Sequence, residues 1–491
     1  MSEIDPDFRE HVERLTALED AGGVLSWDQQ VTMPEGGTPA RSAQTSALST
    51  VTHDLLTDDR MGDWLDDHET RDLDADDRAI VREIRRRHER ARRVPDDLVA
   101  EISEATTEAL PVWEQAREEG DFDAFADALE RLLALKREYA AAIDPDRDPY
   151  AVLMEEFEPY LDVTTVERIL DRLTDRLPPL IEAIEASDVD PDDPFDDPIP
   201  ADRQESAVRA LLDGLGFDWD RGRLDTSTHP FTSGNQFDCR ITTRFDPDDP
   251  LDGIGSTVHE FGHATYELGL PRDAYGTPLG EARDLVVHES QSRFWENHVG
   301  RTRGFWEWAR PILVEHWSET PDADALYRAA NRVEPGPIRV EADELTYHLH
   351  IAIRFEIERD LIRGDLGVEE VPQVWAEKCD DYLGLRPDTD AEGALQDIHW
   401  SHGNVGYFPT YSLGSVLAAQ IDAAIREDVA VEERVRAGEF DPIREWLGEQ
   451  IHCHGQRYTT PELIEAATGT PLTADPFLAY VDEKFGAIYD L

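Results

Sequence analysis

Apolar residues recur with the period of an α-helix along most of this 491-residue chain. The pattern is clear in residues 70–140, in residues 124–141, and again in residues 163–186. Apolar residues three and four positions apart share one face of a helix, which packs against neighbouring helices. The sequence therefore predicts a mainly α-helical protein.

A segment rich in Asp and Pro, residues 186–204, interrupts this pattern and predicts a loop. It separates an N-terminal helical half, residues 1–185, from a second half, residues 205–491, that carries the motifs described below. A chain of this length can form one large domain or about two to three smaller ones. Because both halves are equally helical and no repeat is visible, we expect a single domain of residues 1–491.

One segment, residues 237–245, alternates in polarity and predicts a β-strand. One face would carry Phe237, Cys239, Ile241, Thr243 and Phe245, and the other would carry Asp238, Arg240, Thr242 and Arg244. The charged face is expected either to lie exposed at the edge of a sheet or to line a cleft.

Residues 259–263 read HEFGH. On a helix, His259 and His263 lie one turn apart on the same face, close enough to bind one metal ion. Glu260 would lie beside the metal rather than on it, which suits a base that acts on water. Because such short patterns also arise by chance, two surface histidines on an acidic helix are the alternative. The motif predicts a zinc site of the kind found in peptidases.

A catalytic zinc ion takes three protein ligands and keeps one position open for water. We expect the third ligand to be Glu289, from a second helix packed against the first, which would give a His, His, Glu site. Spacing alone leaves four other candidates open, namely Glu281, Asp284, His288 and Glu296. The chain lacks the third histidine of the pattern HExxHxxGxxH, which excludes the metzincin class.

The net charge of −61 is the strongest feature of the composition. It argues against binding to nucleic acids or anionic membranes, which require basic surfaces. Only three of the 47 basic residues are lysines, namely Lys136, Lys378 and Lys484. An acidic, lysine-poor surface suits a protein that works in molar salt, where a Debye length of about 3 Å screens the repulsion between carboxylates. We therefore expect a halophilic protein.

No run of about 18 apolar residues occurs, so no transmembrane helix is expected. The N-terminus lacks the basic and apolar regions of a secretory signal, and we expect a cytoplasmic protein. The three cysteines, Cys239, Cys379 and Cys453, are too far apart for a zinc-thiolate pattern and too few for a disulfide framework. They are expected to be ordinary buried thiols.

Several motifs in the same order make the chain resemble the Taq-type metallocarboxypeptidases over nearly its whole length, as a haloarchaeal-like member. These motifs are LSWD at 25–28 with Met33-Pro34, HPF at 229–231, DCRIT at 238–242, HEFGH at 259–263, HESQ at 288–291, IRVEAD at 338–343 and GALQDIHW at 393–400. The resemblance implies a single saddle-shaped helical fold with a long deep groove and a small sheet beside the HEFGH helix.

The same resemblance implies the chemistry. Family members release single C-terminal amino acids from peptides with broad preference, and they are commonly homodimers in which cobalt can often replace zinc. Carried over to this chain, the metal ligands are His259, His263 and Glu289, with Glu260 as the general base. In related helical zinc peptidases a His and a Tyr five residues later stabilise the oxyanion, a spacing that His402 and Tyr407 match.

Tyr411 is an alternative to Tyr407, and packing of aromatic side chains in a Gly-rich turn is the alternative for all three residues. An exopeptidase must also bind a free carboxylate, whose two oxygens match the fork of a guanidinium. Arg339 in the IRVEAD motif is the first candidate, followed by Arg240 and Arg244. For each arginine a structural ion pair is the alternative, because the chain has 108 acidic residues.

The sequence thus predicts a zinc carboxypeptidase that acts on peptides. A zinc oligopeptidase that cleaves internal bonds in the same groove is one alternative. A non-catalytic peptide-binding scaffold is another, although a binding protein would have no need for Glu260 beside the metal.

Overall fold

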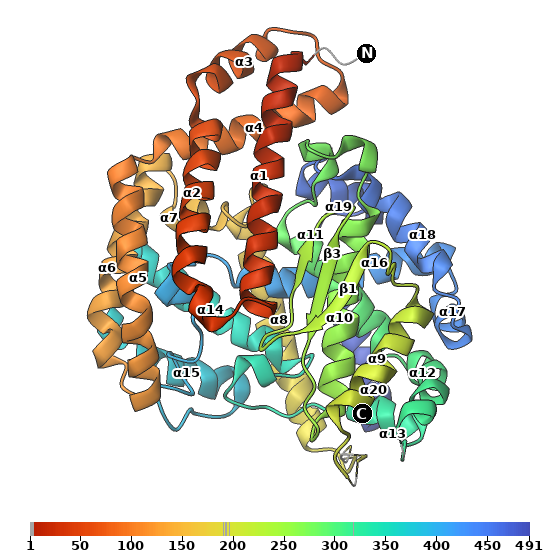
Figure 1. The fold of residues 1–491 in the computed structure, drawn as a ribbon. Coiled ribbons are helices and arrows are strands. Elements are labelled where there is room, and N and C mark those ends of the chain that lie inside the picture. Colours follow the sequence, from red (N-terminus) through yellow and green to blue (C-terminus); the bar gives the residue numbers. More distant parts are fainter. Residues whose placement is uncertain (1–3, 190, 192–193, 196, 318) are drawn as a thin grey trace.

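The computed structural model describes the chain except for residues 1–3, 190, 192–193, 196 and 318. The fold is mainly helical, as predicted (Figure 1). The helices before the Asp/Pro-rich loop are α1 (Pro6–Val31), α2 (Thr38–Thr57), α3 (Asp59–Glu69), α4 (Ala75–Arg93), α5 (Asp96–Glu119), α6 (Asp123–Ile143), α7 (Pro149–Met154) and α8 (Val163–Glu185). Those after it are α9 (Ala201–Leu215), α10 (Pro250–Gly269), α11 (Leu285–Arg293), α12 (Arg303–His316), α13 (Ala323–Ala329), α14 (Thr346–Arg363), α15 (Val371–Leu383), α16 (Pro409–Asp428), α17 (Val431–Ala437), α18 (Asp441–Gln450), α19 (Thr460–Thr468) and α20 (Asp475–Tyr489).

Aspartate starts many of these helices. Asp5, Asp58 and Asp74 each accept a hydrogen bond from a backbone N–H in the first turn of the helix that follows. Such caps satisfy N–H groups that have no partner within the helix. The abundance of acidic residues therefore helps to define helix starts as well as the surface charge.

The loop between α8 and α9 is shorter than predicted. α9 begins at Ala201 with Pro200 at the N-cap position, a few residues before the approximate end of the predicted loop at residue 204. Residues 190, 192–193 and 196 of this loop lie outside the described residues. One buried apolar cluster includes residues on both sides of the loop, from Val94 to Tyr489. The prediction of a single domain stays a prediction.

The sheet has three strands in the order β1 (Gly222–Thr226), β3 (Cys239–Thr243) and β2 (Thr232–Gly234), and it lies beside α10 (Figure 1). β3 runs parallel to β1 and antiparallel to β2. The predicted strand is therefore confirmed, but it is shorter than residues 237–245. Thr242, expected on the charged face, is buried, because its hydroxyl donates to the Phe231 carbonyl and accepts from Ser227. Phe237, expected on the buried face, is 47% exposed.

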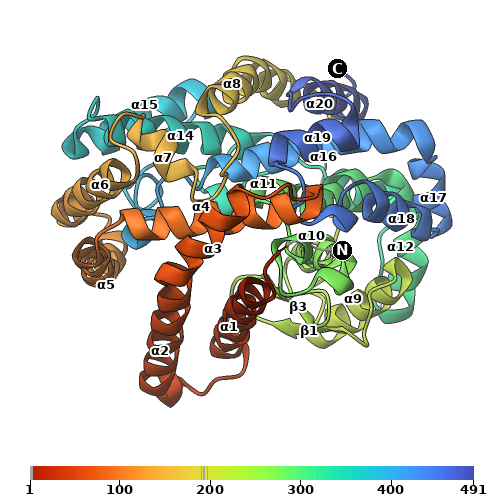
Figure 2. The ribbon, with the colours of Figure 1, turned by 90° about the horizontal axis from the view of Figure 1, so that it is seen from above.

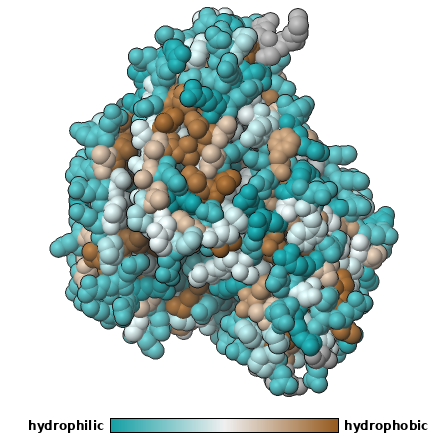
Figure 3. All heavy atoms as spheres, in the orientation of Figure 1, coloured by the Kyte–Doolittle hydropathy of each residue, from teal (hydrophilic) through white to brown (hydrophobic). Residues whose placement is uncertain are grey.

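The N-terminal helices form a separate part of the packing. α1 and α2 run side by side (Figure 2), and α1 also contacts β2. Phe8, Leu65 and Ile84 belong to a small apolar cluster of α1, α3 and α4 that is separate from the main one. The face seen in Figure 3 is mostly hydrophilic, with an apolar area over the α1–α2 region. None of the described helices is both long and apolar enough to span a bilayer.

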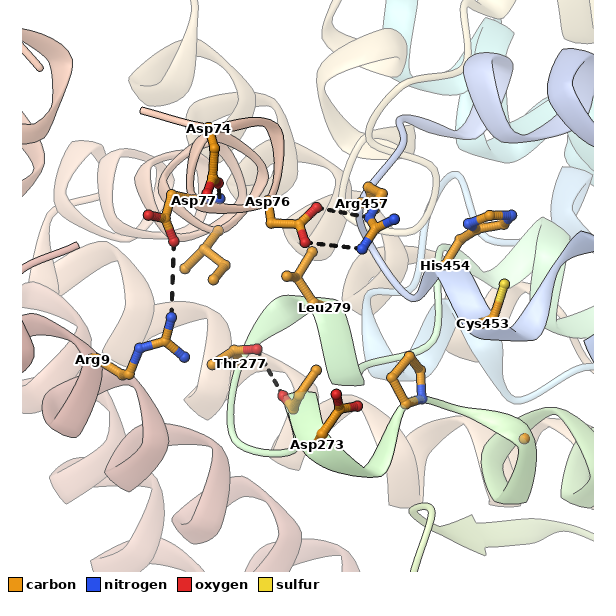
Figure 4. Close-up of a pocket in the computed structure, with 14 residues that line it drawn as sticks. Arg9, Asp74, Asp76, Asp77, Asp273, Thr277, Leu279, Cys453, His454 and Arg457 are labelled. Carbon is orange, nitrogen blue, oxygen red and sulfur yellow. Dashed lines mark hydrogen bonds and ion pairs between the residues drawn. The ribbon is translucent and has the colours of Figure 1, made fainter. Parts of the chain in front are cut away.

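A polar cavity of about 560 Å³ lies where α1 and α4 meet two short segments of the second half, Pro271–Leu279 and Cys453–Arg457 (Figure 4). Cys453 lines this cavity and is exposed, whereas Cys239 and Cys379 are buried as expected. The expectation of a buried thiol was therefore wrong for Cys453, which lies in a short turn at the surface.

Candidate metal centre

Helix α10 carries HEFGH, and α11 and α16 bring the remaining residues of the site to it. Close backbone contact between these helices depends on two glycines. A Cβ atom at Gly262 of α10 would lie 2.5 Å from the Cα atom of Ser292, and one at Gly414 of α16 would lie 2.4 Å from the Cγ atom of Glu289. Only glycine allows this approach. The packing of the three helices therefore positions Glu289 next to α10.

His259, His263 and Glu289 form one cluster, in which a potential ligand atom from each residue lies within 4.8 Å of the others. The Oε2 atom of Glu289 is 3.7 Å from Nε2 of His259 and 3.5 Å from Nε2 of His263. Two imidazoles and one carboxylate are a ligand set of catalytic zinc sites. The residues expected from the sequence are thus brought together in an arrangement that fits a divalent metal ion.

The other nitrogen of each histidine has a polar partner. Nδ1 of His259 is 2.8 Å from Oε2 of Glu296, and Nδ1 of His263 is 2.6 Å from Nδ1 of His288. Nε2 of His288 lies 2.8 Å from Oε1 of Glu267. If the Nδ1–H groups of His259 and His263 donate, both Nε2 atoms keep a lone pair for a metal.

Their contacts distinguish the four other candidates for the third ligand from Glu289. Glu296 and His288 contact the histidines from outside the cluster. Glu281 accepts a hydrogen bond from Thr16, and Asp284 pairs with Arg283 at 2.8 Å. Glu289 is the candidate whose carboxylate belongs to the cluster itself.

Glu260 is buried beside the cluster. Its Oε2 atom accepts a hydrogen bond of 2.6 Å from the hydroxyl of Thr232, a residue of β2. Burial raises the pKa of the Glu260 carboxyl, while the neighbouring His259 opposes the rise. The small sheet therefore has a direct role at the site, because it orients the acid that the sequence marked as the base.

Arg293, at the end of α11, was missed by the sequence interpretation. Its Nε–H donates to Oε1 of Glu289 at 2.7 Å, and an N–H of the same guanidinium donates to Oε2 of Glu296 at 3.1 Å. The guanidinium also lies 5.0 Å from the ring centre of Tyr347. The position four residues after Glu289 was the available signal, but with 44 arginines such spacings are common.

A cavity of about 660 Å³ opens beside the cluster. Its lining includes His259, Glu260, Arg244, Arg293 and Arg339. Two of the three arginines proposed as carboxylate anchors therefore line the same cavity as His259 of the cluster and the expected base.

Arg339 is held rigidly in a short 3₁₀ turn, Arg339–Glu341. Its Nε–H and one terminal N–H donate to Oδ1 of Asp397 at 3.0 and 2.8 Å, and another N–H donates to the hydroxyl of Tyr347 at 3.0 Å. Asp397 also accepts from Arg354 at 2.6 Å. Arg339 is 7% exposed, so it combines an ion pair with access to the cavity.

Arg244 and Arg240, the two other candidate arginines, differ from Arg339 in their surroundings. Arg244 pairs with Asp252 at 2.8 Å at the cavity wall. Arg240 pairs with Asp238 at 2.6 Å, and its guanidinium lies 4.4 Å from the ring centre of Trp27 in α1. Arg240 thus connects the sheet to the N-terminal helices, which is the structural alternative weighed for it.

The expected oxyanion residues lie around the start of α16. The rings of Tyr407 and Tyr411 are 5.3 Å apart, and the Arg339 guanidinium lies 5.3 Å from the ring centre of Tyr411. Burial raises the pKa of both hydroxyls, and the Glu289 charge raises both further. Both phenols are therefore protonated at neutral pH and able to donate a hydrogen bond.

His402 is exposed at the end of the 3₁₀ turn His399–His402. His399, at the other end of this turn, is more enclosed, and its ring centre lies 5.4 Å from that of Tyr407. The sequence interpretation assigned no role to His399, although it belongs to the GALQDIHW motif.

Comparison with known proteins shows that this chain is similar to carboxypeptidases. The family model described as carboxypeptidase Taq (M32) metallopeptidase matches residues 7–485. The thermostable carboxypeptidase 1 of Thermus thermophilus is 40% identical over 501 residues, covering 98% of both chains. The protein of the same name from Pyrococcus furiosus is 38% identical over 482 residues, covering 96% of each.

Solved structures of carboxypeptidases have a similar fold. A Pyrococcus furiosus carboxypeptidase has a TM-score of 0.95 at 37% identity, with 99% of each chain covered. The M32 carboxypeptidase of Deinococcus radiodurans has a TM-score of 0.94 at 36% identity, again with 99% coverage. The similarity extends over the whole fold, including the helices that carry the metal cluster, and the chain belongs to the carboxypeptidase Taq (M32) family of metallopeptidases.

Proposed function

We propose that this carboxypeptidase depends on zinc and releases single C-terminal amino acids from peptides with broad side-chain preference. The observation that carries this proposal is the shared cavity: His259 of the ligand cluster, the buried acid Glu260 and the fixed guanidinium of Arg339 all line it. Metal chemistry and recognition of a chain end can therefore occur on one bound peptide.

Three residues would hold the metal, namely His259, His263 and Glu289. When bound there, zinc supplies Lewis-acid polarisation of a carbonyl and lowers the pKa of water toward about 7. The chain supplies the remaining groups. Glu260 accepts the proton of the attacking water and returns it to the nitrogen of the leaving amino acid, which is general acid–base catalysis. Thr232 keeps the Glu260 carboxylate in one orientation.

The tyrosines and Arg339 complete the site. A hydroxyl of Tyr407 or Tyr411 donates to the oxygen on which negative charge develops, and such donors act strongly in a water-poor site. Arg339 binds the terminal carboxylate of the substrate, and its contacts with Asp397 and Tyr347 fix its fork in advance. His402, because it is exposed, is the weaker of the two oxyanion residues expected from the sequence.

A time course of peptide digestion, followed by mass spectrometry, tests the proposal. We expect a ladder of single-residue losses from the C-terminus that a chelator stops and zinc restores. An oligopeptidase would instead produce internal fragments, and it would cleave a C-terminally amidated peptide as well as the free acid. A scaffold would bind the peptide without turnover.

We also propose that the surface is adapted to molar salt. The three lysines support this, because each is in an ion pair with a glutamate: Lys136 with Glu156, Lys378 with Glu356 and Lys484 with Glu344. Thermal unfolding measured from low to molar KCl should show a melting temperature that rises steeply with salt. A melting temperature independent of salt would contradict the proposal.

Three further expectations stay predictions, namely the homodimer, the cytoplasmic location and the use of cobalt.

A further inference from the structure

An unusual helix follows the metal-site helix α11. Residues Phe294–Gly300 form a π-helix, which is rare and frequently occurs at functional sites. Glu296 lies in this π-helix, while Glu289 and Arg293 lie in α11. In this arrangement Glu296 reaches His259, and Arg293 contacts both glutamates.

The two oxygens of Glu289 have different surroundings. Oε1 accepts a hydrogen bond of 2.7 Å from Nε–H of Arg293. Oε2 is the oxygen that lies 3.7 and 3.5 Å from the Nε2 atoms of His259 and His263, and Ser292 donates to it at 3.2 Å. A guanidinium on Oε1 opposes any rotation of the carboxylate that would direct both oxygens to a metal. The pair is largely buried, with side chains 17% and 9% exposed, so bulk water does not replace this contact.

Resting on the proposed function, we propose that Arg293 is a positioning residue that restricts Glu289 to binding the metal through Oε2 alone. Single-oxygen ligation leaves a coordination position open, which a catalytic zinc site requires. By donating also to Glu296, the partner of His259, Arg293 holds two of the three ligand residues in one network. Outer partners of this kind orient ligands and tune the metal.

The alternative is a structural ion pair that stabilises α11 and has no effect on the metal. The chain offers a matched control for this alternative. Arg426 pairs with Asp422, four residues before it, through Nε at 2.7 Å, the same spacing and distance as Arg293 with Glu289. Asp422 faces His298 and belongs to no part of the proposed metal site.

The test compares Arg293→Lys with Arg426→Lys in the full-length protein in molar KCl. Zinc affinity is measured by competition with a chelator, and the visible spectrum of the cobalt-loaded protein reports the coordination number. We expect Arg293→Lys to bind zinc about 10- to 100-fold more weakly. Its cobalt spectrum should weaken toward that of a higher coordination number, because Glu289 can then bind through both oxygens. Arg426→Lys should match the wild type in both measurements.

Unchanged zinc affinity and an unchanged cobalt spectrum in Arg293→Lys would overturn the inference. The zinc K-edge absorption spectrum of the wild type gives a test that needs no variant. One carboxylate oxygen at about 2.0–2.2 Å supports the inference, and two oxygens from Glu289 overturn it. If the wild type bound neither zinc nor cobalt, the proposed function would fail as well. If it bound metal and trimmed peptides while Arg293→Lys behaved like it, only the inference about Arg293 would fail.

Discussion

Two polar cavities of similar size differ sharply in how their charged groups are arranged. The cavity of about 660 Å³ beside α10 borders on side chains that converge on one point, whereas the cavity of about 560 Å³ between α1, α4 and the Cys453 turn contains separate ion pairs. In the second cavity, Arg457 pairs with Asp76 at 2.9 Å and Arg9 lies 3.9 Å from Asp77 (Figure 4).

The types of residue that line the two cavities do not distinguish the cavities from each other. The second cavity is lined by His454, Cys453 and several aspartates, all of which can bind metals in other contexts. Within the described ranges, however, the cluster of three ligand atoms that lie within 4.8 Å of one another is formed by His259, His263 and Glu289. A metal site thus depends on the convergence of ligand atoms, which close helix packing at Gly262 and Gly414 provides.

The largest expected effect concerns the acid beside the cluster. Glu260→Gln should lower kcat by about 10²- to 10⁴-fold, the usual contribution of general acid–base catalysis, while zinc still binds. Asp273→Asn, a matched change in the second cavity, should leave kcat unchanged. Steady-state kinetics with a free-acid peptide and zinc content by atomic absorption are the measurements. Substantial turnover by Glu260→Gln would refute the role given to this residue.

The second largest effect is expected from a change at Arg339, the proposed binding residue for the C-terminal carboxylate of the substrate. Arg339→Lys keeps the charge but loses the fork, and hydrogen bonds to charged groups contribute about 1.5–3 kcal/mol. We expect kcat/KM for a free-acid peptide to fall by about 10- to 100-fold, mainly through KM. Arg457→Lys in the second cavity is the control and should have no such effect. An equal loss for free-acid and amidated peptides would show that Arg339 does not bind the carboxylate.

A third test addresses the helix contact that makes the ligand atoms converge. Gly414→Ala places a methyl group against the side chain of Glu289, and overpacking of this kind costs about 1–3 kcal/mol. Zinc affinity and the free energy of unfolding should both fall. In contrast, Gly448→Ala in α18, where a Cβ would meet nothing within 4 Å, should stabilise the fold by up to about 1 kcal/mol. Calorimetry and chelator competition measure both effects, and tight zinc binding by Gly414→Ala would contradict this account of the packing.

The smallest effect is a pH dependence from a buried carboxyl group of α14. Burial raises the pKa of Glu358 from 4.5 to about 8, although Gly406 and Trp400 donate to it. The folded state therefore holds this proton more tightly than the unfolded state. The stabilising contribution is complete below about pH 4.5 and is lost as pH rises toward 8, by at most about 1.4 kcal/mol per pH unit. Denaturant unfolding, measured at several pH values in this range, gives the free energy of unfolding as a function of pH. Its slope against pH should be smaller in Glu358→Gln than in the wild type.

Much of the fold could be predicted because helices carry a local signal. The period over residues 163–186 matches α8 (Val163–Glu185) closely, and HEFGH lies on α10 as expected. The third ligand required a choice among five residues within 16 positions, from Glu281 to Glu296, which spacing alone could not make. Only the packing of α11 against α10 distinguishes them, and family resemblance provided that information in advance.

The remaining residues of the site have no local signal that distinguishes them from other residues of the same type. Thr232 meets Glu260 across 28 positions, and Tyr347 meets Arg339 through a turn that periodicity does not describe. Arg293 lies four residues after Glu289 and three before Glu296, spacings that occur in every helix. Arginine is also so common in this chain that no single one is distinguished by its type.

Convergence of ligand atoms, and not the presence of metal-binding residue types, is expected to select the zinc site. Crystals grown with zinc, and data collected on both sides of the zinc absorption edge, test it directly. We expect a strong anomalous peak about 2.0–2.2 Å from Nε2 of His259, Nε2 of His263 and Oε2 of Glu289. We expect no comparable peak in the cavity lined by Cys453 and His454. A dominant peak in that second cavity, or an empty cluster at saturating zinc, would contradict the claim.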